Sequence, residues 1–492
     1  MLLPLLLLLA APAPQEPSFA RYRIDPAGEI IDTLVTDADG DGLSEIWLAT
    51  LEDGVRRISV SKQLGSQGFA AEPAHTQPIS KAVVAWSAGN FLPDEGAELL
   101  LTTREAVYLQ SLGGRPRKIL DSPMLLDLPS ETELPVLREV ADLNADGLDE
   151  IVIPTREGYT LLAGDGTVLA EIPWAPREGR SPVAQQELFG GAATATLSSR
   201  ALSDLFVPEE SPGVVSRPPL MFTSSVLPRP TLEDLNGDGR IDFSFHHRNQ
   251  IRVHLQDEDG GFPRGISMRL DLPELKSQDN EVLRWGQFGG GPGADLLLVR
   301  SGGGLGVSYE WQIRVWFDPV SRGELGEVGH FRKVEGSWVR PTITDLDGDG
   351  LPELGVSIWE LELGLTLRDP RVTHGVYVFR AQADGTGWET RAALASERSY
   401  GVDDLESFAV VPSFPGDLNG DGQGDTLQSS GDGELEFRAL EWAGAPRVGD
   451  PFLRVPVDAL AAVVRVRDLN SDGVGDLLVA HLGHWEIYLS RR

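Results

Sequence analysis

The sequence contains no cysteine among its 492 residues, which excludes disulfide bonds and thiol chemistry. It also lacks a Gly-x-Ser-x-Gly elbow, a P-loop and a His-Glu-x-x-His motif, the signatures of several hydrolase classes. Acidic residues are so frequent that no particular carboxylate pair can be singled out as glycosidase-like. From the sequence we therefore assign no catalytic and no cofactor-binding residue.

Histidine is scarce, with eight scattered residues in the whole chain. The pair His481 and His484 stands on or near a strand and its turn. Two side chains three positions apart on a strand point to opposite faces, so we do not expect this pair to share a zinc ion. Surface or packing roles are expected for the histidines.

Positive charge is also in short supply, because 42 Lys and Arg residues face 75 Asp and Glu residues, a formal charge of −33. Such a surface argues against nucleic acid and anionic membranes as partners. If six divalent ions are bound, as argued below, the charge falls to −21, so much of the acidity serves as metal ligands.

Long apolar runs are absent after residues 1–13, and we expect no transmembrane segment. That first run is too short to span a bilayer permanently and has the character of a secretory signal peptide. Pro12 and Pro14 leave its cleavage site open. We expect an exported protein, periplasmic or extracellular and bacterial in origin, whose oligomeric state the sequence leaves open.

One short acidic loop occurs six times. Its copies have Asp at position 1, Asp or Asn at position 3, Asp-Gly at positions 5 and 6, and an acid at position 9; they start at Asp37, Asp142, Asp234, Asp345, Asp417 and Asp468. Calcium prefers six to eight oxygen ligands in flexible geometry. When the backbone curls around one point, the side chains at positions 1, 3 and 5 converge there, and the glycine at position 6 permits the sharp turn.

We predict about six Ca²⁺ sites, with the side chains at positions 1, 3, 5 and 9 and the backbone carbonyl at position 7 as ligands. The predicted ligand residues are Asp37, Asp39, Asp41, Leu43, Glu45; Asp142, Asn144, Asp146, Leu148, Glu150; Asp234, Asn236, Asp238, Arg240, Asp242; Asp345, Asp347, Asp349, Leu351, Glu353; Asp417, Asn419, Asp421, Gln423, Asp425; and Asp468, Asn470, Asp472, Val474, Asp476.

Two other interpretations of the loop are less favoured. An EF-hand needs a bidentate Glu at position 12 and flanking helices. Position 12 is never acidic, and it is occupied by Leu48, Ile153, Phe245, Val356, Gln428 and Val479. An ordinary Asp-Gly hairpin turn would explain one copy, but six full matches favour metal binding.

The spacing of the loops indicates a repeat of about fifty residues if two degenerate copies are included. Residues 90–98 keep Asn90, Asp94 and Glu98 but have Leu92 at position 3. Residues 287–295 keep only Asp295, so we expect no metal there and little effect of changing Asp295. The metal occupancy of the copy at 90–98 stays open.

Each step of the repeat holds several short apolar runs between Gly-rich turns, which indicates an all-β protein. Steps of this length suit a four-stranded propeller blade better than helical repeats. The loops, together with the run Gln-Phe-Gly-Gly-Gly-Pro-Gly-Ala-Asp at 287–295, resemble the FG-GAP/VCBS repeat family, which includes the integrin α-chain propeller. The resemblance covers nearly all of the chain after the leader and implies that each blade carries its calcium loop between its first and second strands.

We therefore predict a single propeller over residues 18–492, with eight blades, or seven if one degenerate copy is not a blade. Only two strands follow Asp476, and the run at 19–24 could supply the missing fourth strand and close the ring. The two long steps predict insertions at about 174–230 and 355–412. A ninth unit around 202–207 is a less favoured alternative, because no Asp-Gly loop accompanies it.

Eleven tryptophans could line a carbohydrate groove or pack between blades. We favour packing for Trp47, Trp86, Trp285 and Trp485, which lie on or beside expected strands. A second group of five crowds the region of the second insertion: Trp311, Trp316, Trp338, Trp359 and Trp388. If there is a ligand surface, the two insertions are the best candidates, because loops on a rigid scaffold usually carry function.

The favoured hypothesis is a secreted, calcium-binding, non-enzymatic propeller that binds an extracellular protein or glycan, as in cell adhesion. The alternative is a polysaccharide-active, lyase-like enzyme on a calcium-containing propeller. A deep cleft with Lys, Arg, His or Tyr around a calcium ion would favour the enzyme, and a flat or open face would favour binding.

Overall fold

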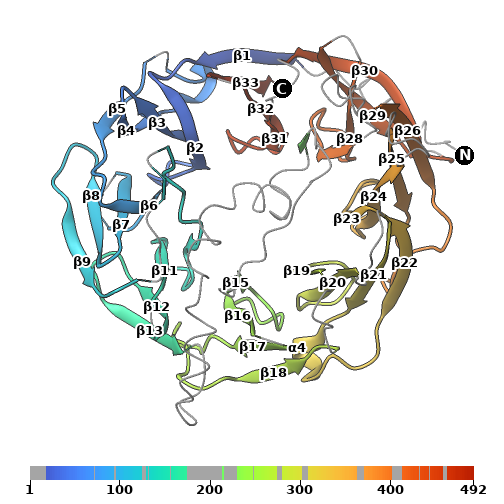
Figure 1. The fold of residues 1–492 in the computed structure, drawn as a ribbon, viewed down its shortest axis with the longest axis horizontal. Coiled ribbons are helices and arrows are strands. Elements are labelled where there is room, and N and C mark those ends of the chain that lie inside the picture. Colours follow the sequence, from blue (N-terminus) through green and yellow to red (C-terminus); the bar gives the residue numbers. More distant parts are fainter. Residues whose placement is uncertain are drawn as a thin grey trace, which may run out of the picture.

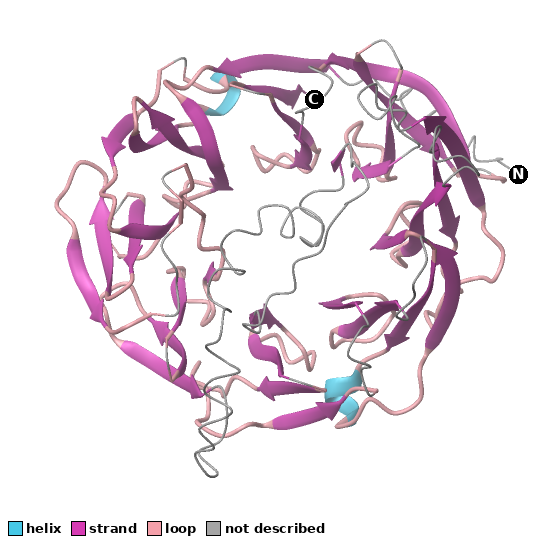
Figure 2. Cartoon of the chain, in the orientation of Figure 1, coloured by secondary structure: helices cyan, strands magenta, loops and turns pink. Residues whose placement is uncertain are grey.

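The structure is a computed structural model that describes residues 18–491 apart from positions 71, 94–95, 125–128, 131, 156, 174–212, 215–229, 248, 274–279, 302–307, 363–370, 402–412, 431–432, 443, 458–462 and 482. Eight antiparallel sheets are arranged around a ring (Figures 1 and 2). Seven of them have their strands in sequence order, and in the eighth the first strand of the chain, β1, pairs outside β33. The prediction of an eight-bladed propeller with four-stranded blades is confirmed. The copies at 90–98 and 287–295 each belong to a blade of their own, which excludes seven blades.

The first four blades use strands β2 to β18. Blade 1 is β2 (Glu29–Thr36), β3 (Glu45–Glu52), β4 (Val55–Ser61) and β5 (His75–Pro78); blade 2 is β6 (Val83–Gly89), β7 (Glu98–Thr103), β8 (Ala106–Ser111) and β9 (Arg117–Asp121); blade 3 is β10 (Val140–Ala141), β11 (Glu150–Pro154), β12 (Gly158–Leu162) and β13 (Val168–Pro173); blade 4 is β15 (Pro230–Glu233), β16 (Asp242–His247), β17 (Gln250–His254) and β18 (Met268–Asp271).

The remaining blades complete the circle. Blade 5 is β19 (Asn280–Gly286), β20 (Asp295–Ser301), β21 (Tyr309–Trp316) and β22 (His330–Gly336); blade 6 is β23 (Trp338–Thr344), β24 (Glu353–Glu362), β25 (Arg371–Phe379) and β26 (Leu394–Gly401); blade 7 is β27 (Ser413–Gly416), β28 (Asp425–Ser429), β29 (Glu434–Glu441) and β30 (Arg447–Pro456); blade 8 is β31 (Val463–Arg467), β32 (Asp476–Ala480), β33 (Trp485–Arg491) and β1 (Ser18–Ile24). The helical elements of the described ranges are the 3₁₀ turn η1 (Gly65–Gln67) and the short helix α4 (Pro319–Arg322).

The ring closes through β1, as predicted. This strand pairs antiparallel with β33 from Ser18 opposite Arg491 to Ile24 opposite Trp485, and so supplies the outer strand of blade 8. β1 runs along the outer edge of the ring, with β33 beside it on the inner side (Figure 1). The closing strand covers the edge of β33 that would otherwise present unpaired backbone groups.

The second strands of the blades are deeply buried. In β3 the first six residues are buried, and in β20 all seven are, whereas β2 alternates between buried and partly exposed positions. A strand sandwiched between neighbouring blades has no solvent face, so its sequence is a continuous apolar run rather than an alternating one.

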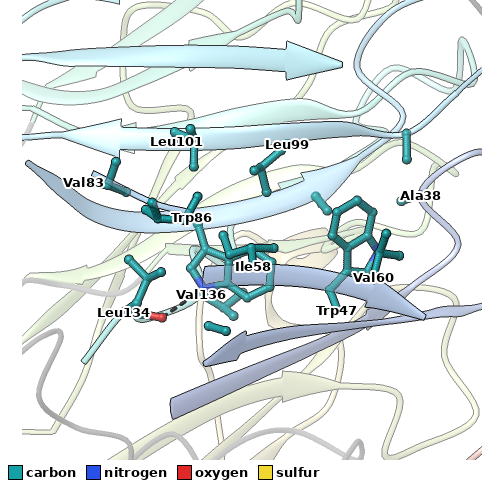
Figure 3. Packing of buried hydrophobic residues seen from close by; sticks show 14 of the residues in the cluster. Ala38, Trp47, Ile58, Val60, Val83, Trp86, Leu99, Leu101, Leu134 and Val136 are labelled. Atoms are coloured by element: carbon teal, nitrogen blue, oxygen red, sulfur yellow. Dashed lines mark hydrogen bonds between the residues drawn. The ribbon is translucent and has the colours of Figure 1, made fainter. Parts of the chain in front are cut away.

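Tryptophans fill the space between blades. Trp47 and Trp86 are 1% and 0% exposed and pack in one cluster between blades 1 and 2. The indole Nε1 of Trp86 donates to the carbonyl of Leu134 at 2.9 Å, which satisfies its polar atom inside the core (Figure 3). Trp285 and Trp485 are also buried, so the packing prediction is confirmed for all four.

The predicted insertion at 355–412 is largely wrong. Within it, most of β24, all of β25 and all of β26 are strands of blade 6. The long loop-to-loop step arises in part because β24 and β25 have ten and nine residues, against five in β11.

The other predicted insertion separates β13 from β15. Gly213–Val214 form the short strand β14, which pairs with β31 on the inner side of blade 8. The rest of 174–229, the proposed ninth unit at 202–207 and the predicted leader at 1–13 lie outside the described residues. Within the part that the structure describes, no helix is long and apolar enough to cross a bilayer.

Candidate metal centres

The six acidic loops occupy equivalent places in their blades. Each joins the first strand to the second, as loop 37–44 joins β2 to β3. The two degenerate copies connect the corresponding strands of blades 2 and 5. All eight loops therefore lie on one rim of the ring, because each follows the innermost strand at the same end.

The aspartate at position 1 organises each complete loop. In blade 1, Asp37 Oδ1 accepts the amide of Asp41 at 3.1 Å and Asp37 Oδ2 accepts the amide of Gly42 at 2.8 Å. The glycine amide at position 6 makes the same bond in the other five loops. These glycines have φ between 81° and 88°, and a Cβ would meet nothing within 4 Å at any of them, so backbone conformation alone demands glycine.

Position 5 tightens the turn further. Asp41 Oδ1 accepts the amide of Leu43 at 2.9 Å, and the equivalent bond to the position-7 amide recurs in the other five loops. Two loops gather three carboxylates with ligand atoms within 4.8 Å of one another. They are Asp37, Asp39 and Asp41 in blade 1, and Asp345, Asp347 and Glu353 in blade 6.

The acid at position 9 has a structural role that the sequence analysis did not anticipate. In every one of the eight loops it lies buried at the base and accepts the amide of position 2 at 2.7 to 3.1 Å. The position-2 side chain is buried in all eight copies: Ala38, Phe91, Leu143, Leu235, Phe288, Leu346, Leu418 and Leu469. Both signals were present in the sequence, because the degenerate copies keep an acid at position 9 and an apolar residue at position 2.

Burial changes the protonation of these acids. It raises the pKa of Glu45, Glu150 and Glu353 to about 7, and neighbouring loop carboxylates add to the rise. The pKa of Asp242 and Asp476 is raised to about 6 and that of Asp425 to about 8, also mainly by burial. A cation at the loop centre would favour the charged carboxylates and oppose these shifts.

Asparagine at position 3 links the acids within a loop. Asn144 and Asn419 donate their side-chain nitrogens to the position-9 acids at 3.0 and 2.9 Å. Asn236 and Asn470 donate instead to the position-5 aspartates at 3.0 and 3.2 Å. The predicted role of these asparagines as neutral oxygen ligands stays a prediction.

Basic side chains enter two of the loops. Lys62, just after β4, forms an ion pair with Asp39 and lies 3.8 Å from Asp41. In blade 4, Arg240 at position 7 pairs with Asp238 at 2.6 Å. Lys62 lies seventeen residues beyond the end of its loop, so no local sequence signal identifies it as a neighbour of the site.

The donor set of the blade 1 loop fits a hard divalent cation. Asp39 Oδ1 and Glu45 Oε1 are buried and accept no hydrogen bond from any described residue. An unpartnered buried carboxylate oxygen is costly unless a cation or donor meets it. Residues Asp37, Asp39, Asp41 and Glu45 could hold Ca²⁺, which would supply charge neutralisation and cross-link the turn to the base of the blade.

The degenerate loops are held by protein contacts instead. In blade 5, Asp295 accepts the amides of Phe288 and Gly289 through Oδ2 and the amide of Asp318 through Oδ1, at 2.6 to 2.8 Å. The expectation that changing Asp295 does little is therefore inconsistent with its contacts. In blade 2, the side chain of Asn90 donates to Gly147 O at 2.7 Å. This hydrogen bond joins the degenerate loop to the loop of blade 3. Asp94 lies outside the described residues.

Neighbouring loops are joined through their backbones. Position 8 of one loop donates to position 1 or 2 of the preceding blade's loop, as Ser44 N does to Leu469 O at 2.9 Å and Gly475 N does to Asp417 O at 3.0 Å. Gly424 N to Leu346 O and Asp149 N to Asn90 O make the same connection. Loops 6, 7, 8 and 1 thus form one continuous chain along the rim.

The second tryptophan group is buried as well. Trp311, Trp316, Trp338, Trp359 and Trp388 are each at most 4% exposed, so they pack within the blades and do not form an open stacking surface. Indeed, Trp359 stacks on His374 with ring centroids 4.3 Å apart.

The expectation that the side chains of His481 and His484 point to opposite faces is wrong. They flank a tight turn between β32 and β33, with His481 N donating to His484 O at 2.9 Å, so they oppose each other across a hairpin and share a face. Their rings stack with centroids 4.3 Å apart.

No protein-family model and no curated protein matches this chain at a significant level. Solved structures that it resembles include the WD40 domain of SCAP from fission yeast, with 9% identity over 96% of this chain and 94% of that chain and a TM-score of 0.41. They also include BBS1N in complex with ARL6DN, with 10% identity over 98% of both chains and a TM-score of 0.35. An Agrocybe aegerita lectin that recognises non-reducing terminal N-acetylglucosamine matches at 12% identity over 76% of this chain and 86% of that chain, with a TM-score of 0.37. These low values place no constraint on function.

Proposed function

We propose that this chain is an exported, calcium-stabilised propeller of the FG-GAP/VCBS kind that acts as a non-enzymatic scaffold for binding a protein or glycan outside the cell. The observation that carries the proposal is the set of six complete acidic loops at equivalent places on one rim of a closed ring. The unpartnered oxygens of Asp39 and Glu45 support a cation in the first of them.

The position of the loops favours a structural role for the ion. Each loop connects a solvent-exposed turn to a buried position-2 side chain and a buried position-9 acid, and both hold the base of the blade. Filling the loop would stiffen the rim without exposing a catalytic group. A stiff ring that presents other loops is the arrangement on which binding proteins commonly rely.

Two measurements test the proposal. Metal analysis of the protein purified in calcium and passed over a desalting column should find about six Ca²⁺ per chain, as the six loops predict. The metal assignment would be wrong if no calcium were bound, or if the calcium count did not fall when the acids of a loop were replaced by alanine.

The binding role is tested with the intact secreted protein on a glycan array and in pull-downs from an extracellular fraction, in calcium and in chelator. We expect saturable binding to a defined glycan or protein that weakens when calcium is removed. Turnover of a polysaccharide by the purified chain would instead favour the lyase-like alternative, and a chain that retains nothing on either assay would contradict the scaffold.

A further inference from the structure

A second kind of metal-ligand group lies at the other end of blade 8. Among the described residues, His481, His484 and Glu486 offer ligand atoms that all lie within 4.8 Å of one another. They stand at the turn between β32 and β33, which is the end of β32 opposite its acidic loop. This group is therefore on the rim that the calcium loops do not occupy.

The hairpin register explains why the three side chains converge. Val479 opposes Glu486 and Ala480 opposes Trp485, so the next pair is His481 opposite His484. Directly opposed residues share a face, and residues two apart on a strand share a face. His484, just before β33, and Glu486 on β33 are two positions apart, and His481, just after β32, faces them across the hairpin.

The distances suit an ion held by two imidazoles and a carboxylate. His484 Nε2 lies 3.6 Å from Glu486 Oε1, and His481 Nε2 lies 3.8 Å from Glu486 Oε2. Ligands at zinc bond lengths in a tetrahedron are separated by about 3.3 Å, so small side-chain movements suffice for these two pairs. The imidazole rings are now parallel, at an interplanar angle of 3°, and must turn about their Cβ–Cγ bonds until their lone pairs converge.

The carboxylate is already held in place by neighbouring groups. Tyr488 donates its hydroxyl to Glu486 Oε2 at 2.8 Å, and Arg21 of the closing strand β1 forms an ion pair with Glu486 Oε1. Such second-layer hydrogen bonds orient a ligating carboxylate. The side chains of Glu486 and His481 are 4% exposed and that of His484 is 17% exposed, so the group is largely shielded from water and still reachable.

We propose that His481, His484 and Glu486 bind one borderline divalent cation of the zinc class, with the fourth position open to water or a ligand. Nitrogen donors distinguish this site from the oxygen-only calcium loops, because imidazole suits Zn²⁺, Cu²⁺, Ni²⁺ and Fe²⁺ rather than Ca²⁺. Through Glu486 and Arg21, the ion would tie the last hairpin to the strand that closes the ring.

The test is calorimetric titration of the full chain with Zn²⁺ in saturating Ca²⁺, which keeps the acidic loops filled. We expect one Zn²⁺ per chain, and we expect His484→Ala to weaken binding by about tenfold or more, as loss of a ligand should. His75→Ala is the matched control, because His75 lies on β5 of blade 1, where its ring contacts Gln77, and belongs to a different blade from this hairpin.

Two results would overturn the site. One is a wild-type chain with no saturable zinc binding, and the other is a His484→Ala variant that binds as tightly as the wild type. Asp347→Ala must leave zinc binding intact, since its loss there would place the ion in an acidic loop. Substitution with Co²⁺ gives a further readout on the folded wild type, because a four-coordinate Co²⁺ site shows strong visible absorption bands, whereas six-coordinate oxygen sites absorb only weakly.

Discussion

The loops of blade 1 and blade 5 hold the same place in their blades but are built differently. The first gathers Asp37, Asp39 and Asp41 around one point, whereas the second has Gly289 and Gly291 at two of those positions. Both nevertheless keep the buried acid at position 9, Glu45 or Asp295, and both use it to hold the position-2 amide. The difference separates two functions within one motif, because positions 2 and 9 hold the blade in both loops, whereas the acids at positions 1, 3 and 5 are present only in the loop with a candidate metal site.

Of the changes considered, removing calcium should lower the stability of the protein most, because it empties the complete loops and leaves the degenerate ones unaffected. A site kept at one hundred times its dissociation constant contributes about 2.7 kcal/mol of stability, and several such sites add together. We therefore expect excess chelator to lower the melting temperature strongly, and added calcium to restore it. A calorimetric melting curve that chelation leaves unmoved would refute structural calcium.

Changing the position-9 acid should be costly in both kinds of loop. We expect Asp476→Ala and Asp295→Ala each to lower the free energy of unfolding by about 3 kcal/mol, because each leaves buried amides without their acceptor at about 1–3 kcal/mol per group. The measurement is denaturant unfolding in chelator, where metal cannot contribute. If Asp295→Ala proved neutral there, the structural role of position 9 would be wrong.

Changing position 3 should affect only a complete loop. Asp347→Ala should remove one bound Ca²⁺ and the share of thermal stability linked to it, about 2.7 kcal/mol at one hundred times the dissociation constant, with little change in chelator. Asp295→Ala serves as the opposite control, since it should lower stability in chelator and keep the calcium count. Equal behaviour of the two variants in both assays would remove the distinction.

The smallest effect is expected from changing Lys62, whose ammonium group pairs with Asp39 and would compete with calcium for that carboxylate in blade 1. An exposed ion pair contributes about 1 kcal/mol or less, so Lys62→Met should raise the calcium affinity of that one site by about fivefold or less. Competition with a chromophoric chelator measures it. Arg57→Met, which removes an ion pair with Glu52 on the same blade, is the control and should leave the affinity unchanged.

The number of blades and the closure of the ring could be predicted from the sequence, because the acidic loop recurs at a regular spacing. The degenerate copies also identified their blades correctly. Glu98 and Asp295 each accept the position-2 amide of their loop, a role that does not depend on metal. The spacing of the loops does not distinguish long strands from an insertion. Residues 355–412 were therefore predicted as an insertion, although they hold most of β24 and all of β25 and β26.

Contacts between distant segments were the other limit. Lys62 reaches Asp39 only after β3 and β4 have formed a hairpin, and Asp318 reaches Asp295 only after β20 and β21 have paired. The error at His481 and His484 had a local cause, because the two residues lie on either side of a chain reversal, where the side-chain alternation of a single strand does not apply. In each case the sequence shows which residue types are present, but it does not show which of them come into contact in the fold.

The pairing of β1 with β33 also bears on how the chain is made. Residues 18–24 leave the ribosome long before residues 485–491, so their partner does not yet exist while the other blades form. Such a non-local pairing carries a large loop-closure cost and is expected to be slow. Until it forms, two neighbouring chains could exchange their first strands, which makes a strand-swapped dimer the expected misassembly at high concentration.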